Sequence, residues 1–280
     1  MHKINLIHGN CIHEMTKLIK QNVKVDLVVT SPPYDSLRNY NESLTWDFEV
    51  FKEVATKLYG ILKDGGVIVW IVNDKTDKGS KTLTSFKQAL FFKEIGLNIH
   101  DVMIFAKKNP VPQIFHKRYT DAFEYMFIIS KGQPNTCNPL LESCITAGEK
   151  SKTFKRISTN DQDGYIDKGT KTKDFKIKSN IWYYGLGGTN YGHPAVFPLG
   201  LAKDHILSWS NEGDLVLDPF MGSGTVGVAC QELNRDFIGI EKVEKYYNIS
   251  KKRIDNTQMK LIWKIVFFYN TKSLYISLYI

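Results

Sequence analysis

The chain has 280 residues, of which 42% are hydrophobic, enough for one large α/β domain or for one domain with a sizeable insertion. Its formal net charge of +8 favours a polyanionic partner, and it has no run of about 20 apolar residues that could span a membrane. The N-terminus lacks an apolar signal region and the four cysteines lack metal-ligand spacing, so we expect a cytoplasmic protein with free thiols and no metal.

Strand and helix patterns alternate along most of the chain. In chain order the predicted elements are a strand over 3–9, a helix over 11–20, a strand over 25–30, a helix over 48–62, a strand over 67–72, a helix over 85–96, strands over 98–107 and 124–130, a helix over 201–210, a strand over 214–220, a helix over 224–233 and a strand over 236–241. This alternation predicts a doubly wound, mainly parallel α/β sheet with a Rossmann-like arrangement.

The alternation stops between residues 130 and 182. This segment is rich in Lys, Thr, Asn, Asp and Gly, and its basic residues are interspersed with Phe154, Tyr165 and Phe175. It can be a long solvated loop, but loops of this length are usually functional or disordered, and basic and aromatic residues together suit nucleic acid. We therefore divide the chain into 1–129, an inserted recognition region over 130–182, 183–256, and a tail over 257–280 of unknown role.

The first dense motif is Ser31-Pro32-Pro33-Tyr34, which follows the buried strand over 25–30. Proline cannot donate to a sheet ladder, so the strand has to stop there, and each proline fixes its own φ. The expected result is a stiff loop at the carboxyl edge of the sheet, where open α/β sheets bind their ligands. A rigid turn that merely contains Ser and Tyr is the alternative.

The second motif is a glycine-rich turn between a strand and a helix. Gly222, Gly224 and Gly227 follow a strand that ends at Asp218, and Glu241 ends the next strand. Glycines in this context bring the backbone close to a nucleotide, and a strand-end carboxylate can accept hydrogen bonds from ribose hydroxyls. An adenosine-containing cofactor is therefore expected, with a ligand-free turn as the alternative.

The residues before the glycines distinguish between cofactors. Asp218-Pro219-Phe220 places a carboxylate at the strand tip, which would repel a pyrophosphate but can pair with an ammonium group. S-adenosyl-L-methionine (AdoMet) has an ammonium group and no phosphate, and Phe220 can line the same pocket. The motif thus favours AdoMet over NAD.

Together, the two motifs resemble those of the β-type amino-group DNA methyltransferases, the N4-cytosine and N6-adenine family. TSPPY matches its catalytic motif, and DPFMGSGT with IGIE matches its AdoMet motifs. HPAVFPLGLAKDHI resembles the segment that precedes DPF, and LIHGNCIHEM resembles the N-terminal G-D-C stretch, with Asn10 in place of the usual Asp. The resemblance extends over residues 3–255 and implies base flipping and direct methyl transfer to an exocyclic amine of double-stranded DNA.

The resemblance also implies roles for particular residues. Ser31 Oγ and the Pro32 carbonyl would accept the two amine hydrogens, Pro33 would keep the loop rigid, and Tyr34 would stack on the flipped base. The residues expected at the cofactor are Asn10, Cys11, Asp218, Pro219, Phe220, Gly222, Gly224, Thr225 and Glu241. Those expected at DNA phosphates are His116, Lys117, Arg118, Lys152, Lys155 and Arg156.

The target base and the partners are less sharply defined. Serine before Pro-Pro-Tyr favours N4 of cytosine, and N6 of adenine is the alternative. An NAD-dependent oxidoreductase and a catalytically silent nucleic-acid-binding protein are more distant alternatives. The resemblance leaves open whether a cognate restriction endonuclease accompanies the chain and whether the chain forms a homodimer. Asn73 and Asp74 follow the strand over 67–72, which suggests a place at the same sheet edge.

Overall fold

The computed structural model describes residues 2–33, 46–112, 117–149, 154–156, 165–167, 171–186 and 198–259, with the backbone alone for the two three-residue stretches. The chain divides into two compact units. One consists of Met1–Asn138 with Asn180–Ile280, and the other of Pro139–Ser179. The second unit is shorter than the predicted insertion, because residues 130–138 and 180–182 belong to the first.

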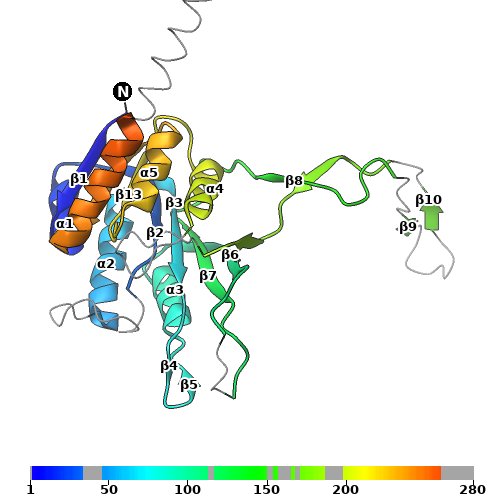
Figure 1. Cartoon of the computed structure of the whole chain (residues 1–280), viewed down its shortest axis with the longest axis horizontal. Helices are drawn as coiled ribbons and strands as arrows, with labels where there is room; N and C mark the ends of the chain where they lie inside the picture. Colours follow the sequence, from blue (N-terminus) through cyan, green and yellow to red (C-terminus); the bar gives the residue numbers. More distant parts are fainter. Residues whose placement is uncertain are drawn as a thin grey trace, which may run out of the picture. The chain divides into compact units, whose positions relative to one another are not determined.

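The first unit contains an eight-stranded sheet with the order β1-β14-β13-β2-β3-β7-β6-β12 (Figure 1). β7 is antiparallel to both neighbours, whereas the other neighbouring pairs are parallel. The strands are β1 (Ile4–His8), β2 (Val25–Thr30), β3 (Leu62–Val72), β6 (Asn98–Lys107), β7 (Phe123–Ser130), β12 (Ile181–Tyr184), β13 (Leu215–Asp218) and β14 (Asp236–Glu241). The predicted doubly wound, mainly parallel sheet is confirmed.

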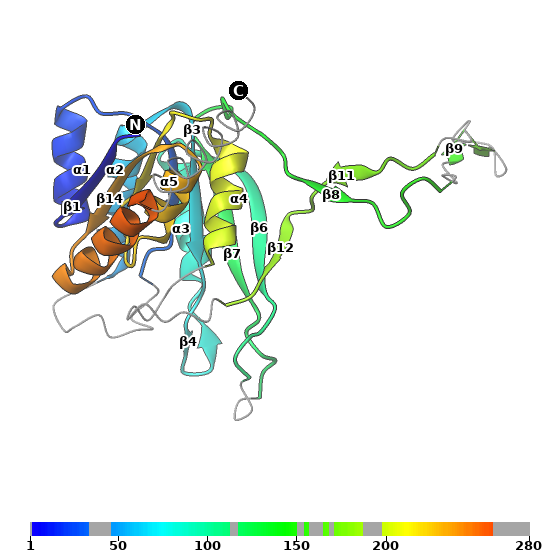
Figure 2. The ribbon, with the colours of Figure 1, turned by 45° about the horizontal axis from the view of Figure 1, so that its top comes forward.

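Helices cover both faces of the sheet (Figure 2). α1, α2 and α3 pack on one face around Phe51, Trp70 and Phe92, three fully buried aromatic residues. α4, α5 and a helix over 244–259 lie on the other, where Gly227 of α5 packs closely against Phe237 and Ile254. The labelled helices are α1 (Cys11–Lys20), α2 (Phe48–Ile61), α3 (Thr84–Glu94), α4 (Leu199–Trp209) and α5 (Thr225–Glu232). Continuous apolar runs form the central strands because both faces are buried.

Three local features differ from the sequence prediction. β3 starts at Leu62 and not at the predicted residue 67, and its register with β2 moves from Val25↔Leu62 to Leu27↔Val67, so the strand begins with an irregularity. A short hairpin of β4 (Thr76–Asp77) and β5 (Ser80–Lys81) follows β3. The helix over 244–259 continues through the first residues of the predicted tail.

The second unit contains short antiparallel pairs. β8 (Leu141–Ser143) pairs with β11 (Phe175–Ile177), and β9 (Phe154–Arg156) pairs with β10 (Tyr165–Asp167). Three-residue strands with exposed apolar side chains, such as Phe175 and Ile177, bury little apolar surface.

Among the helices of the described residues, none combines the length and hydropathy needed to cross a bilayer.

Candidate functional site

The sheet register brings the two sequence motifs together at the carboxyl edge. β13 lies between β2 and β14, with Leu217 opposite Val28 and Asp218 opposite Gly239. The ends of these three parallel strands therefore meet at one edge, where parallel strands commonly bind ligands. The loop that begins at Ser31 and the glycine turn after Asp218 are neighbours although they are far apart in sequence.

A buried hydrogen bond joins the two motifs directly. Thr30 Oγ1 donates to Asp218 Oδ1 at 2.7 Å, and the Phe220 backbone N–H donates to the same oxygen at 3.1 Å. Both Thr30 and Asp218 are buried. Sequence reasoning assigned no role to Thr30, because a hydroxyl at a strand end shows its partner only when the neighbouring strand is known.

Asp218 has an environment that suits a cationic ligand. The pKa of its carboxyl group is raised from 3.8 to about 7, mainly by burial and to a smaller extent by the nearby charge of Glu241, against the lowering effect of the hydrogen bonds from Thr30 and Phe220. A positive group placed beside this carboxylate would stabilise the charged form. The ammonium group expected from the sequence is such a group, so the site fits it.

Glu241 fastens the glycine turn to the end of β14. Its Oε2 accepts from the Gly222 backbone N–H and its Oε1 from the Val243 backbone N–H, each at 2.8 Å. Burial is the main effect on its carboxyl group and raises the pKa, whereas these amide bonds lower it. Each carboxylate oxygen can accept more than one hydrogen bond, so the predicted contact with ribose hydroxyls is compatible with this structural role.

The glycine turn requires glycine on steric grounds. Gly222 and Gly224 have φ values of +52° and +80°, and a Cβ atom on Gly224 would lie 2.8 Å from the Cβ of Ser250. Arg253, from the helix over 244–259, donates to the backbone oxygen of Ser223 and, at 2.8 Å, to its Oγ. Arg253 was not predicted, because nothing in its sequence context indicates which loop it reaches.

Thr225 and Pro219 complete the turn. Thr225 begins α5 and is buried, with its Oγ1 3.5 Å from Arg253 Nη1. Pro219 is buried after β13. Phe220 is partly buried and makes edge contacts with Trp46, at 5.2 Å between ring centroids, and with Trp70, at 6.4 Å. These aromatic rings give the edge an apolar wall next to the two carboxylates.

Asn10 and Cys11 lie at the start of α1, after β1. Asn10 Oδ1 accepts from the backbone N–H groups of Ile12 (2.9 Å) and His13 (3.3 Å), so Asn10 caps the helix. The cap uses the carbonyl oxygen, so the predicted contact with the cofactor would fall to the NH2 group. Burial raises the pKa of the Cys11 thiol to about 12, and Glu241 adds to the shift, which places this thiol near the second carboxylate.

The structure describes the predicted catalytic loop in part. Ser31 and Pro33 are partly buried and Pro32 is buried at the end of β2. Tyr34 lies outside the described residues, so its predicted role in stacking is untested. The described residues 31–33 do lie at the carboxyl edge, directly after Thr30, which contacts the Asp218 carboxylate.

The residues predicted to contact DNA phosphates lie in two separate segments of the chain. Lys117 and Arg118 are exposed in the connection between β6 and β7, and Arg118 Nη2 donates to the Gly79 carbonyl. Lys155 and Arg156 belong to β9 of the second unit, where the backbone alone is described. His116 and Lys152 lie outside the described residues.

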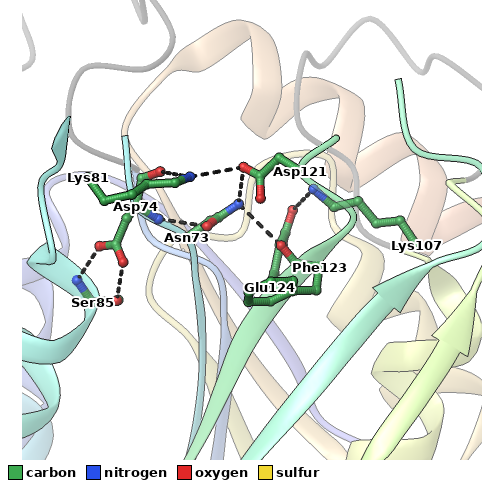
Figure 3. A network of polar contacts seen from close by, with 8 residues as sticks. All are labelled: Asn73, Asp74, Lys81, Ser85, Lys107, Asp121, Phe123 and Glu124. Atoms are coloured by element: carbon green, nitrogen blue, oxygen red, sulfur yellow. Dashed lines mark hydrogen bonds and ion pairs between the residues drawn. The ribbon is translucent and has the colours of Figure 1, made fainter. Parts of the chain in front are cut away.

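Asn73 and Asp74 lie at the predicted edge and form part of a polar network there (Figure 3). Asp74 accepts from the backbone N–H of Ser85 (2.9 Å) and from its Oγ (2.7 Å), and so caps α3. Asn73 Nδ2 donates to Asp121 Oδ2 (3.1 Å) and to the Phe123 carbonyl. These contacts give both residues a structural function.

The fold and site define an α/β enzyme of the Rossmann-like methyltransferase class. The sequence model of a family described as DNA methylase, which covers N6 and N4 methyltransferases, matches residues 25–252. The "Orphan methyltransferase M.BamHII" of Bacillus amyloliquefaciens is 45% identical over 85% of this chain and 92% of its own length. The chain therefore belongs to the N6/N4 DNA methylase family, and the resemblance inferred from the motifs is confirmed.

Solved structures agree with this assignment. The crystal structure of an M1.HpyAVI–SAM complex matches with a TM-score of 0.59 and 28% identity, over 89% of this chain and 99% of that one. The cytosine-N4-specific PvuII DNA methyltransferase matches with a TM-score of 0.63 over 90% of this chain and 86% of that one. At 20% identity, the PvuII enzyme supports the fold alone.

Proposed function

We propose that this chain methylates the N4 amine of cytosine in double-stranded DNA, with AdoMet as the methyl donor. Family membership makes it an AdoMet-dependent DNA amino-methyltransferase, and the solved relative M1.HpyAVI was crystallised with SAM. The observation that carries the proposal is the hydrogen bond between Thr30 and Asp218, because Ser31 directly follows Thr30 and therefore lies close to the carboxylate proposed to bind the cofactor.

The residues around the glycine turn account for cofactor binding. Bound AdoMet supplies a methyl group on a sulfonium, which is reactive toward a neutral amine. Asp218 pairs with the ammonium group, and Glu241 accepts from the ribose hydroxyls while it holds Gly222. Phe220 supplies apolar surface, and Gly224 lets the backbone come close without a Cβ atom in the way. Asn10 and Cys11 lie on the adenine side of the proposed site.

The loop after β2 prepares the amine. The lone pair of an exocyclic amine is delocalised into the ring, so the amine has to be oriented before it can attack a methyl carbon. Ser31 Oγ and the Pro32 carbonyl accept hydrogen bonds from the two N–H groups of the amine and so orient its nitrogen toward the methyl carbon. Pro32 is buried and both prolines are rigid, so these acceptors need little reorganisation when the reaction occurs. Tyr34 stacks on the flipped base.

Ser31 also favours cytosine over adenine. A hydroxyl is a weaker acceptor than the carboxylate of an Asp in this position, and it can also donate to the ring edge next to the amine. N6 of adenine is the alternative, because both bases present an exocyclic amine to the same two acceptors. Digestion of methylated DNA to nucleosides, followed by mass spectrometry, tests the proposal. N6-methyladenine without N4-methylcytosine would reject the base assignment and leave the amino-methyltransferase activity intact.

The second unit, Pro139–Ser179, is proposed to read the target sequence. Its support is the basic and aromatic composition around Phe154 and Tyr165, with Lys155 and Arg156 on β9. A cognate restriction endonuclease, a homodimer and a cytoplasmic location remain predictions. Binding measurements with AdoMet and NAD separate this proposal from an oxidoreductase, and labelled methyl transfer separates it from a silent DNA-binding protein.

A further inference from the structure

Two neighbouring segments extend from the carboxyl edge of the sheet, side by side in both views (Figures 1 and 2). One is the β4–β5 hairpin, residues 75–81, and the other consists of the end of β6 and the described residues that connect it to β7, 107–112 and 117–121. We call these two segments the edge protrusions. Thr30 lies opposite Trp70 and Val72 opposite Tyr125, so the protrusions start at the same edge as the loop of Ser31.

The edge protrusions carry an excess of positive charge. They contain seven Lys or Arg and two Asp, a net +5 compared with +8 for the whole chain. Charge gathered at one edge indicates a polyanion at that edge, whereas charge kept for solubility would be dispersed. A target base has to reach Ser31 at this edge, so the duplex on either side of it has to pass nearby.

The two protrusions are fastened to each other by a network of polar contacts (Figure 3). Asp121 Oδ2 accepts from Asn73 Nδ2 at 3.1 Å and from Lys81 Nζ at 3.3 Å, and Lys81 also donates to the Asp74 carbonyl at 3.1 Å. At the tip of the hairpin, Arg118 donates to the Gly79 carbonyl. The Asp121 carboxylate is thus used inside the network, and the protrusions are held as one element.

The tip of the hairpin presents a lysine in an unfavourable conformation. Lys78 and Gly79 have φ values of +45° and +82° between the paired residues Asp77 and Ser80. Tight hairpin turns with two positive φ values suit Asn-Gly or Asp-Gly, because lysine seldom adopts this conformation. Lys78 is exposed, so no packing in the described part of the chain accounts for it. An external anionic partner would account for a cation at the tip.

We propose that the edge protrusions form a DNA-backbone clamp, in which Lys78 contacts a phosphate next to the target base. The clamp rests on the proposed function and adds a contact region outside the Pro139–Ser179 unit. Lys108 and Lys117, both exposed, supply further phosphate contacts from the second protrusion. Arg118 holds the hairpin with one donor and keeps other guanidinium donors for the backbone of the duplex.

The test compares Lys78→Asn with Lys20→Asn. Asparagine suits the turn, so Lys78→Asn removes the charge without disturbing the hairpin. Lys20 is an exposed lysine at the last residue of α1, which leads away from the carboxyl edge, and its loss lowers the net charge equally. Binding of each full-length variant to a labelled DNA duplex is measured by fluorescence anisotropy over a series of salt concentrations, and thermal unfolding is recorded in parallel.

Lys78→Asn should weaken DNA binding about three- to ten-fold at moderate salt and reduce the slope of log K against log salt by about 1. Its Tm should be equal to that of the wild type or higher, and Lys20→Asn should leave affinity and slope unchanged. Equal behaviour of the two variants, with wild-type binding and methylation intact, would overturn the clamp alone. A wild-type chain that binds no duplex would overturn the proposed function as well.

Discussion

The buried carboxylate of Asp218 leads to the sharpest prediction. Asp218→Asn keeps an oxygen that can accept from Thr30 Oγ1 and the Phe220 N–H, but it removes the negative charge. The substitution therefore separates the charge from the hydrogen bonds, whereas alanine would remove both. A charged hydrogen bond contributes about 1.5–3 kcal/mol, so AdoMet should bind the variant about ten- to a hundred-fold more weakly.

The same substitution should change the pH dependence of stability. The pKa of Asp218 is raised, so the folded protein holds this proton more tightly than the unfolded chain, and the charged form is disfavoured by folding. The wild type should lose stability as pH rises from about 4 to 7, relative to Asp218→Asn. The interval between 3.8 and about 7 corresponds to at most about 4 kcal/mol.

AdoMet binding should show the opposite dependence on pH, because the ammonium group requires the charged carboxylate. With a pKa of about 7, wild-type affinity should be about five-fold lower at pH 6 than at pH 7, and the affinity of Asp218→Asn should vary less. Both pH values lie below the range in which an α-amino group loses its proton. Calorimetric titration measures the affinities, and denaturant unfolding between pH 4 and 8 measures the stabilities.

Two results would refute this reasoning. Wild-type affinity in Asp218→Asn would show that the carboxylate does not bind the ammonium group. A stability difference between variant and wild type that is constant from pH 4 to 8 would show that the buried carboxylate keeps its ordinary pKa. The two results are independent, because one concerns the ligand and the other the protein without it.

Three further predictions follow from the site and the second unit. Ser31→Ala should lower kcat about a hundred-fold or more with little change in AdoMet affinity, because Ser31 acts on the amine; equal losses in both would contradict this. Neutralising Lys152, Lys155 and Arg156 together should weaken DNA binding and flatten its salt dependence, and unchanged binding would place recognition elsewhere. Arg253→Met should raise the KM for AdoMet about ten-fold while kcat changes little, because the glycine turn loses its anchor; a loss confined to kcat would argue against this.

The sequence predicted the parts of the fold that depend on local patterns. Apolar runs alternating with amphipathic segments indicated the doubly wound sheet, because strand and helix periodicity can be read without long-range information. The carboxyl-edge position of Ser31 and Asp218 followed as well, because both motifs end strands of a mainly parallel sheet. In each case the prediction needed only the type of an element and its direction.

Features that depend on the neighbours of a strand were not predictable. The partners of Thr30, Glu241 and Arg253 are set by strand order and helix placement, which a single sequence does not reveal. The hairpin at 76–81 was missed because Lys78-Gly79 is not a common turn pair. The end of the predicted insertion at 182 was also set too late, because β12 pairs with β6 in the main sheet.

The cofactor site and the edge protrusions carry charges of opposite sign. In the described part of the chain, the carboxylates of Asp218 and Glu241 accept hydrogen bonds from the Thr30 hydroxyl and from the backbone N–H groups of Phe220, Gly222 and Val243, and none of these donors carries a positive charge. If an arginine donated these hydrogen bonds, it would lower the pKa values of both carboxyl groups, and its positive charge would cancel their attraction for a positive ligand.

The edge protrusions show the opposite arrangement. There, the Asp121 carboxylate is paired with Lys81, and Lys78 remains at the exposed tip. AdoMet, with its sulfonium and ammonium groups, is a net cation, and DNA is a polyanion, so the two substrates require opposite fields within a short distance. The carboxylate of Asp218 is buried at the sheet edge, whereas Lys78 is exposed on the hairpin that extends from this edge. Lys78→Asn, which removes a positive charge, and Asp218→Asn, which removes a negative charge, should therefore affect different substrates, the first DNA and the second AdoMet, because each charge acts mainly on the ligand nearest to it.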